Sequence, residues 1–424
     1  MVETDPRTQA ASPVSAPANV AAEAAFTAAN ALIAERRVAE AQAMHLRAAE
    51  AGHPRAQVEL ARMLLYGIAG PAEPASAVQW LLRAEAGGNP VAGYLLALAA
   101  LGGLALPRDQ SINERLGLAI DAGLPSALLA AAIHFGRKPH PDDQALCIGF
   151  LERATSLGDR TAASLLAERL AAGEGMAAQP ELAAGMRQQL SEQGLSPLPA
   201  VTAPPPWQPP CPPRQLAIED ALALAPARLL STRPRVGVVD GLLSADECRL
   251  LIASTQPILR ASRTVDPDTE LPITLPLRTS SDASLDPVQE DFALRMVQLR
   301  ICAAAGIDLP HAEYLTVLRY EPGQEYRPHR DYVPPGAIER DRPQAGNRAR
   351  TICVYLNDVE AGGATEFPVP GVKVAPKAGT AVVFDNLRAD GSPDPDTLHA
   401  GLPVERGVKW LATLWLRQGH YRDF

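Results

Sequence analysis

Between residues 25 and 175, Ala and Leu recur at the spacing of amphipathic helices, interrupted at regular intervals by glycine. Four joints of this kind begin 35 or 36 residues apart, at Gly52, Gly88, Gly123 and Gly158. A glycine can end the first helix of a pair, a short turn that often contains proline reverses the chain, and alanine lets the two helices approach closely. Because no single pair buries its own apolar face, the pattern predicts a stacked array of helix pairs.

The block Gly52-His53-Pro54-Arg55-Ala56 and its later copies resemble the joints of Sel1-like repeats, which are related to tetratricopeptide repeats. The later copies depart from the Ala-Ala pair of that family, with Ala119-Ile120 and Ala154-Thr155. The resemblance implies an N-terminal α-solenoid over residues 25–175 that binds a protein partner or substrate. The alternative is an ordinary helical bundle without regular stacking.

Prolines dominate the chain between residues 197 and 213, which include Pro204-Pro205-Pro206. This composition predicts an extended, semi-rigid polyproline II spacer, and a ligand for an SH3-type domain is the alternative. A helix is expected over Gln215–Leu230. We therefore predict a disordered tail over residues 1–24 and a proline-rich linker with a short helix over residues 176–233.

The second half of the chain changes to short β-branched runs separated by turn residues. An alternating strand at Tyr314–Tyr320, a Pro-Gly turn and a second strand at Glu325–Asp331 follow from the pattern. In the second strand His329 and Asp331 are two residues apart, so their side chains leave the same face. They could be two ligands of a 2-His-1-carboxylate iron site, or a hydrogen-bonded pair that needs no metal.

A third candidate ligand, His399, precedes a long apolar strand. Alternation along that strand puts five side chains on one face, those of Lys409, Leu411, Thr413, Trp415 and Arg417. The other face carries apolar residues, so this lysine would lie inside a barrel. A lysine buried in a barrel needs an anion, and we expect it to line the same cavity as the metal.

Composition and charge narrow the classes of function. Of the 424 residues 47% are apolar and 21% are charged, which is typical of globular domains. The net charge of -9 argues against nucleic-acid binding, and five scattered cysteines fit a reducing compartment better than a disulfide framework. The N-terminal residues show no signal peptide, and the uncharged stretch 91–107 is too short for a membrane span. We expect a cytoplasmic protein that binds neither nucleic acid nor membrane.

Residues 234–424 resemble the prolyl 4-hydroxylase-like branch of the 2-oxoglutarate, Fe(II)-dependent dioxygenases. The matching motifs are, in chain order, Val236–Ser244 with Glu247-Cys248, Arg278-Thr279-Ser280, Tyr320–Asp331, Arg350–Asp358, Gly362–Pro368, Pro376-x-x-Gly379, and His399 with Lys409 ten residues later. The resemblance implies a C-terminal double-stranded β-helix, or jelly roll, with supporting helices. The first half and this domain together make a two-part protein.

The resemblance also implies roles for individual residues. His329, Asp331 and His399 would hold Fe(II), and Lys409 would pair with the 5-carboxylate of 2-oxoglutarate. Further cosubstrate contacts are expected from Tyr320, Thr365, Thr413 and Trp415. The iron centre would carry the chemistry without a separate acid or base residue, with O2 as cosubstrate and ascorbate as reductant.

The implied reaction hydroxylates an unactivated C–H bond while 2-oxoglutarate is converted to succinate. A lysine rather than an arginine at position 409 favours the collagen-type and plant-type prolyl hydroxylases, hence a prolyl residue of a protein or peptide, recruited by the repeats. Candidate substrate-side residues are Arg278, Tyr326, Arg348 and Arg350, and the arginine-rich segment 338–350 is either a substrate lid or a solvated turn. The alternatives are a hydroxylase of a free amino acid or small molecule, and an inactive repeat scaffold.

Overall fold

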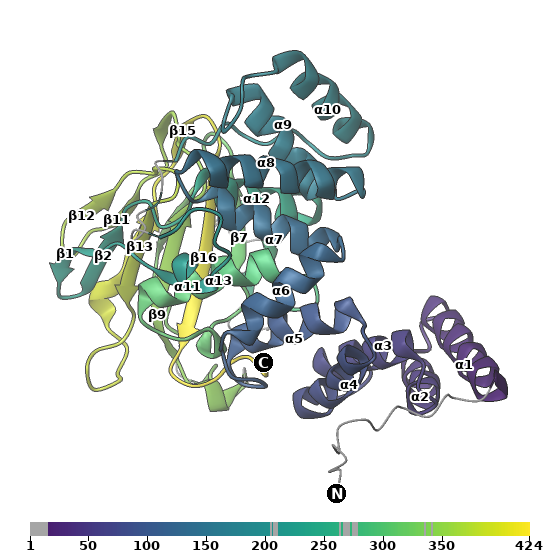
Figure 1. The fold of residues 1–424 in the computed structure, drawn as a ribbon. Helices are drawn as coiled ribbons and strands as arrows, with labels where there is room; N and C mark the ends of the chain where they lie inside the picture. The colour runs from purple at the N-terminus through teal and green to yellow at the C-terminus, as the bar shows by residue number, and fades with distance from the viewer. Residues whose placement is uncertain are drawn as a thin grey trace, which may run out of the picture. The chain divides into compact units, whose positions relative to one another are not determined.

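The computed structural model describes residues 16–203, 206, 211–262, 264–265, 272–273, 279–334, 336–340 and 342–424 (Figure 1). The first part of the chain is a run of helices: α1 (Ala16–Ala34), α2 (Val38–Glu50), α3 (Pro54–Leu65), α4 (Pro74–Ala86), α5 (Pro90–Gly102), α6 (Ser111–Asp121), α7 (Pro125–Gly136), α8 (Pro141–Ser156), α9 (Arg160–Ala172) and α10 (Pro180–Glu192). Figure 1 shows these helices in the purple-to-teal part of the chain. The predicted array of helix pairs is confirmed.

The four glycine joints have the conformation that the sequence predicts. Gly52, Gly88, Gly123 and Gly158 have φ angles between 73° and 88°, in the left-handed region that residues with a Cβ avoid. Prolines follow the first three joints at the first residue of α3, α5 and α7, where a missing N–H costs nothing. The joints therefore end one helix and start the next by local backbone chemistry.

The chain divides into two compact units, residues 1–96 and 97–424, with the boundary inside α5. In the first unit α1 to α4 pack against their neighbours in sequence. Its core combines leucines with many small side chains, among them the fully buried Ala29, Ala41, Ala48 and Ala56. Helices α6 to α10 belong to the second unit, together with both β-sheets.

The predicted boundaries differ from the structure in three places. Helix α1 begins at Ala16, within the segment expected to be a tail, and α10 lies in the expected linker. The helix expected over Gln215–Leu230 is only α11 (Ile218–Leu222), and strand β1 (Arg228–Thr232) already begins within that range. Pro226 accounts for the short helix, since proline and the residue before it both disfavour helical backbone. Part of the proline run, residues 204–205 and 207–210, lies outside the described residues.

Two antiparallel sheets form the rest of the second unit. The large sheet has the order β1-β2-β13-β9-β16-β7-β6-β3, and the small sheet β12-β11-β14-β8. The strands of the large sheet after β1 are β2 (Arg235–Val239), β3 (Arg260–Ala261), β6 (Ser281–Ser284), β7 (Thr316–Tyr320), β9 (Arg348–Tyr355), β13 (Ala381–Asp385) and β16 (Lys409–Arg417). The small sheet contains β8 (Tyr326–His329), β11 (Thr365–Phe367), β12 (Val372–Val374) and β14 (His399–Gly401). Short pairs are β4 (Thr264–Val265) with β5 (Pro272–Ile273), and β10 (Ala361–Gly362) with β15 (Val404–Arg406).

The core of this β-domain lies between the two sheets. Leu318, Tyr355 and Leu411 of the large sheet form one buried cluster with Phe367 of the small sheet. Two facing antiparallel sheets with crossed connections are the predicted jelly roll. Strand β16 lies between β9 and β7 in the large sheet, and the small sheet supplies the second wall of the barrel.

Helices α12 (Ala245–Thr255) and α13 (Phe292–Ala305) pack on the large sheet, against β7 and β9, and the repeat helices α7 and α9 pack on them (Figure 1). Four buried arginines at this junction contact carboxylates. Glu247 on α12 accepts hydrogen bonds from Arg137 and Arg300, and Asp246 accepts from Arg169. Arg249 bonds Glu174 at 2.6 and 2.7 Å and Asp246 at 3.1 Å. The last repeats and the β-domain thus share one buried ionic junction.

Among the described residues no single helix is long and apolar enough to cross a membrane. Only α6 and α7 taken together, bent by 118° at their joint, reach the required length and composition.

Candidate active site

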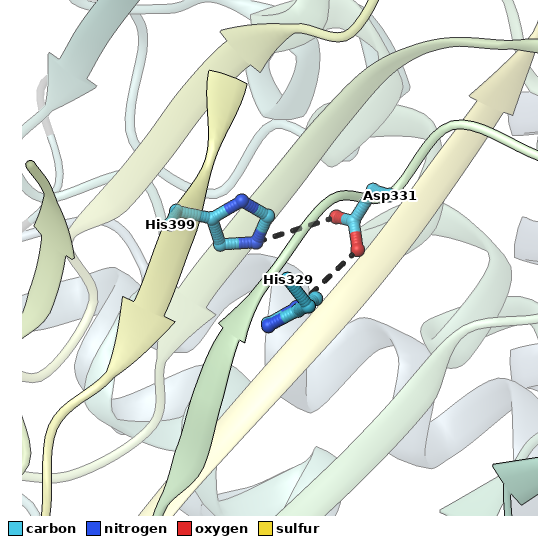
Figure 2. Close-up of side chains that lie close together, drawn as sticks. All are labelled: His329, Asp331 and His399. Carbon is cyan, nitrogen blue, oxygen red and sulfur yellow. Dashed lines mark ion pairs between the residues drawn. The ribbon is translucent and has the colours of Figure 1, made fainter. Parts of the chain in front are cut away.

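The three predicted metal ligands meet at one end of the small sheet. His329 ends β8 and lies directly opposite His399, the first residue of the antiparallel strand β14. Asp331 follows two residues after His329, and its carboxylate lies 3.5 Å from His329 Nε2 and 3.7 Å from His399 Nε2 (Figure 2). The three candidate ligand atoms all lie within 4.8 Å of one another. Cross-strand pairing therefore brings together residues that are 70 positions apart in the sequence.

Backbone carbonyls fix the orientation of both imidazoles. His329 Nδ1 lies 2.8 Å from the carbonyl oxygen of Arg327, and His399 Nδ1 lies 3.0 Å from that of Thr397. A carbonyl oxygen only accepts, so each Nδ1 carries the proton and each Nε2 keeps a lone pair toward Asp331. Burial lowers the pKa of His399 to about 4, which favours its neutral form. This is the form in which imidazole binds metals.

Asp331 is buried and ionised. Burial by itself would raise its pKa, but interactions with His399 and His329 hold the pKa of Asp331 well below its ordinary value. Thr351 on β9 donates a hydrogen bond of 2.8 Å to Oδ2 of the carboxylate. The backbone carbonyl of Asp331 accepts a weaker bond of 3.3 Å from Arg348.

The triad opens into a cavity between the sheets. Thirteen described residues line it: Leu318, Tyr320, Tyr326, His329, Asp331, Cys353, Thr365, His399, Gly401, Lys409, Leu411, Thr413 and Trp415. The predicted inward face of β16 is confirmed at four of its five positions. The fifth, Arg417, is instead bonded to Glu313 and to the carbonyl of Gly346.

Lys409 lies inside this cavity with 1% of its surface exposed. Its Nζ is 5.2 Å from the centre of the Tyr320 ring and 5.5 Å from that of Tyr355, and no carboxylate of the described residues pairs with it. Burial lowers the pKa of Lys409 to about 8, so the ammonium form still predominates at pH 7. The cavity thus holds a buried positive charge without a protein counter-ion among the residues described.

The other predicted cosubstrate contacts, Tyr320, Thr365, Thr413 and Trp415, all line the cavity. Thr365 accepts a hydrogen bond of 2.7 Å from the hydroxyl of Tyr355. The Nε1 of Trp415 is buried and has no hydrogen-bond partner within the described part of the chain. These positions lie around Lys409 as a cosubstrate site would require, and their roles stay predictions.

The predicted substrate-side residues are scattered. Tyr326 lines the cavity and stacks on the His329 ring at 3.4 Å between centroids. Arg348 is held by Glu313 at 2.7 and 2.8 Å and lies over the Trp415 ring at 4.2 Å. Arg350 points elsewhere, toward Asp385 at 2.5 Å and the carbonyl of Ala305, and Arg278 lies outside the described residues.

The arginine-rich segment proposed as a lid or solvated turn is partly regular. A short 3-10 helix covers Pro343–Ala345, and β9 already begins at Arg348. The lid itself stays a prediction.

Sequence reasoning missed four residues around the site. Thr351 and Asn386 support Asp331, while Cys353 and Tyr355 line or support the cosubstrate end of the cavity. Thr351, Cys353 and Tyr355 alternate along β9, so strand periodicity beside the Arg350–Asp358 motif was a usable signal. Asn386 carried no such signal, because only the pairing of β13 with β9 brings it near Thr351.

Comparison with known proteins defines the class. Residues 315–417 match the family model of the 2OG-Fe(II) oxygenase superfamily, and they include the triad and Lys409. Fe(II), 2-oxoglutarate and O2 are the cofactor and cosubstrates that this family implies.

Curated relatives define the family within that class. Probable prolyl 4-hydroxylase 3 of Arabidopsis thaliana is 37% identical over 213 residues, which cover 46% of this chain and 73% of the relative. Prolyl 4-hydroxylase 1 of the same plant is 35% identical over 204 residues, covering 45% and 71%. Prolyl 4-hydroxylase subunit alpha-1 of Rattus norvegicus is 36% identical over 203 residues, covering 46% and 37%. Through its C-terminal part the chain belongs to the prolyl 4-hydroxylase family.

Solved structures match each half separately. A viral collagen prolyl hydroxylase from Paramecium bursaria Chlorella virus-1 is 29% identical and covers 43% of this chain and 95% of its own, with a TM-score of 0.35. A Sel1 repeat protein from Oxalobacter formigenes is 18% identical and covers 41% and 73%, with a TM-score of 0.37.

Proposed function

We propose that this protein hydroxylates a prolyl residue of a protein or peptide, with Fe(II) held by His329, Asp331 and His399 and with 2-oxoglutarate anchored by Lys409. One observation carries the proposal. A triad of two imidazoles and a carboxylate, whose ligand atoms lie within 4.8 Å, opens into the same cavity as a buried lysine that lacks a carboxylate partner among the described residues. A metal alone would not need the lysine, and an anion alone would not need the triad.

The donor set fits Fe(II). Two neutral imidazole nitrogens and one carboxylate are the ligands of non-haem iron oxygenases, and they leave positions free for cosubstrates. When bound, iron together with 2-oxoglutarate and O2 supplies the oxidising power to hydroxylate a C–H bond and leaves succinate and CO2. The chain itself contributes the orientation of both imidazoles through their bonds to backbone carbonyls.

Lys409 fits the distal carboxylate of 2-oxoglutarate. Its ammonium shares the cavity with Tyr320 and Thr365, whose hydroxyls can complete the hydrogen bonds of a carboxylate. Binding an anion there replaces an unpaired buried charge with an ion pair in a low-dielectric site. Thr413 and Trp415 stand further along the same strand face, toward the triad.

No carboxylate or imidazole outside the triad lines the cavity in the described part of the chain. This supports a reaction without a separate protein acid or base. We place the substrate near Tyr326 and Trp415, which line the cavity beside the triad, and near the guanidinium of Arg348, which covers Trp415.

The prolyl substrate is proposed from the relatives, which are prolyl 4-hydroxylases by name. We further propose that the helix-pair array recruits the protein substrate, that ascorbate keeps the iron reduced, and that the protein works in the cytoplasm. The supports for these are the repeat pattern, the family and the scattered free cysteines.

The test is O2-dependent succinate release by the full chain with Fe(II), 2-oxoglutarate and a panel of proline-containing peptides, followed by mass spectrometry of the peptides. We expect a 16 Da increase on proline, absent with His399→Ala. Thr316→Val is the matched control, because Thr316 is buried in β7 and bonds Ser284 rather than the triad. Succinate release with no peptide modified would redirect the proposal to a small-molecule substrate, and no succinate from folded protein would overturn it.

A further inference from the structure

Asp331 accepts a hydrogen bond from a side chain of the opposite sheet. It follows β8 of the small sheet, whereas Thr351 lies on β9 and Asn386 directly follows β13, both in the large sheet. Thr351 Oγ1 is 2.8 Å from Asp331 Oδ2, and Asn386 Nδ2 is 2.8 Å from Thr351 Oγ1. Both Thr351 and Asn386 are fully buried.

The donor and the acceptor of each hydrogen bond in the series from Asn386 through Thr351 to Asp331 follow from the chemistry of the three side chains. An ionised carboxylate only accepts, so the Thr351 hydroxyl must donate its single proton to Asp331. Its oxygen then has only lone pairs left, so the Asn386 amide must present its NH2 group to it. The Oδ1 of Asn386 is left buried and without a partner among the described residues, which shows that the amide is oriented by Thr351 rather than by its own acceptor.

The backbone anchors Asn386 in turn. Its N–H donates to the carbonyl of Ala349 at 2.9 Å, and its carbonyl accepts from the N–H of Asp394 at 3.0 Å. We call this series of hydrogen bonds the relay. It runs from the backbone of Asn386 through the buried side chains of Asn386 and Thr351 to one carboxylate oxygen of Asp331. A group held in this way has little freedom to rotate.

We propose that Thr351 and Asn386 are positioning residues that fix the rotation of the Asp331 carboxylate through the hydrogen bond to Oδ2. Oδ1 lies 3.5 Å from His329 Nε2 and Oδ2 lies 3.7 Å from His399 Nε2, so this rotation sets how the carboxylate faces the two imidazoles. This inference rests on the metal site of the proposed function and not on the identity of the substrate.

The test uses Co(II) alone as the probe, titrated anaerobically into the metal-free full chain and followed by its visible absorption. Thr351→Val keeps the shape and removes the hydroxyl, whereas Thr351→Ser keeps the hydroxyl. We expect the Co(II) Kd of Thr351→Val to rise about 10- to 100-fold, which is typical of lost outer-shell partners. Thr351→Ser should stay within about threefold of wild type, and Asn386→Ala should fall between the two.

A second readout separates positioning from a general loss of stability. Adding 2-oxoglutarate to the Co(II) protein should change the spectrum of wild type and Thr351→Ser, and require higher concentrations in Thr351→Val. Thr316→Val removes a partly buried hydroxyl bond away from the triad and should leave both readouts unchanged. This control measures how much Co(II) affinity and the response to 2-oxoglutarate change when a hydroxyl away from the triad is removed.

Wild-type Co(II) affinity and spectrum in Thr351→Val would overturn the inference. If that variant does not fold, wild-type Co(II) binding by Asn386→Ala would overturn it instead. If wild type itself binds no Co(II), the triad is not a metal site, and the proposed function fails together with the relay. If only the inference about the relay is wrong, the wild-type protein still binds Co(II) and shows its visible spectrum, so the two failures can be distinguished.

Discussion

Two regions of the second unit bury positive charge, and they do so in opposite ways. At the junction of the repeats with the β-domain, four buried arginines each contact Asp246, Glu247 or Glu174. In the barrel, Lys409 is equally buried and has no carboxylate partner in the part of the chain described. Arginines with carboxylates from the same chain complete their own ion pairs. A buried cation without such a carboxylate indicates a binding site for an anion that is not part of the chain.

The largest effect should come from removing the repeat side of the junction. A chain that starts at residue 211 would leave Asp246, Glu247 and Arg249 without Arg169, Arg137 and Glu174, their partners from the repeat side, and would expose the covered faces of α12 and α13. We expect it to be insoluble or unfolded by circular dichroism. A chain that starts at residue 90 keeps all of α5 to α10 and should fold and bind Co(II) as the full chain does. Cooperative unfolding of the short chain would show that the junction is dispensable.

Glu247→Gln tests how much the junction contributes to stability, because it replaces one carboxylate oxygen of Glu247 with an amide nitrogen. Arg137 and Arg300 would then face a neutral amide, and two buried guanidinium groups would lose their shared counter-charge. We expect the free energy of unfolding in urea to fall by about 3–5 kcal/mol. Asp240→Asn, at an exposed carboxylate whose nearest pair is 3.9 Å away, is the matched control and should change little. A loss under 1 kcal/mol at Glu247 would contradict the account.

Lys409→Met should act in the opposite direction on stability. The pKa of Lys409 is lowered from 10.5 to about 8, so burying its charge costs about 3 kcal/mol below pH 8. The variant should therefore be as stable as the metal-free wild type or more stable, by up to that amount. Its affinity for 2-oxoglutarate should fall about 100-fold, as for loss of one partner of a buried charge pair. Destabilisation by Lys409→Met would mean that the ammonium has an unrecognised partner.

The same charge predicts a pH dependence. The folded-state pKa of Lys409 lies below the unfolded value, so its unfavourable contribution is fully present below pH 8 and disappears as the pH rises toward 10.5. For ligand binding the sign is reversed, because only the ammonium pairs with a carboxylate. We expect the Kd of 2-oxoglutarate, measured by calorimetry on the Co(II) protein, to rise about tenfold per pH unit above pH 8. Lys409→Arg, charged throughout, should show no such rise if it binds at all.

The smallest effect is expected for an exposed pair. Arg319 and Glu321 approach to 2.9 Å on the surface, and pairs of this kind contribute under about 1 kcal/mol. Arg319→Gln should leave the midpoint of urea unfolding nearly unchanged. A loss as large as that of Glu247→Gln would show that burial is not what distinguishes the two kinds of charge.

Local patterns predicted much of this molecule. The glycine joints defined the helix pairs, the spacing of His329 and Asp331 placed both on one strand face, and alternation along β16 placed Lys409 in the cavity. Each depends on residues close together in the sequence, where backbone geometry leaves few choices. His399 was a candidate ligand from its place before β16, but its position beside His329 depends on the long-range pairing of β14 with β8.

What the sequence did not predict depends on tertiary packing. The relay from Asn386 through Thr351 exists only because β13 and β9 are neighbours, and no spacing rule connects residues 331, 351 and 386. The ionic junction was also invisible, since charged residues on helices usually face water. Helix α10 was missed because its apolar content is low, with Ala183 and Leu190 as its buried residues.

Anaerobic titration tests whether Lys409 anchors 2-oxoglutarate beside the triad. Fe(II) and 2-oxoglutarate are added without O2 to the full-length protein, and the weak visible absorption of their complex is titrated in wild type, Lys409→Met and Thr316→Val. The account predicts a saturable band in wild type and in Thr316→Val, and about 100-fold weaker 2-oxoglutarate binding in Lys409→Met. A folded wild-type protein that gives no band, or a Lys409→Met variant that saturates like wild type, would contradict it.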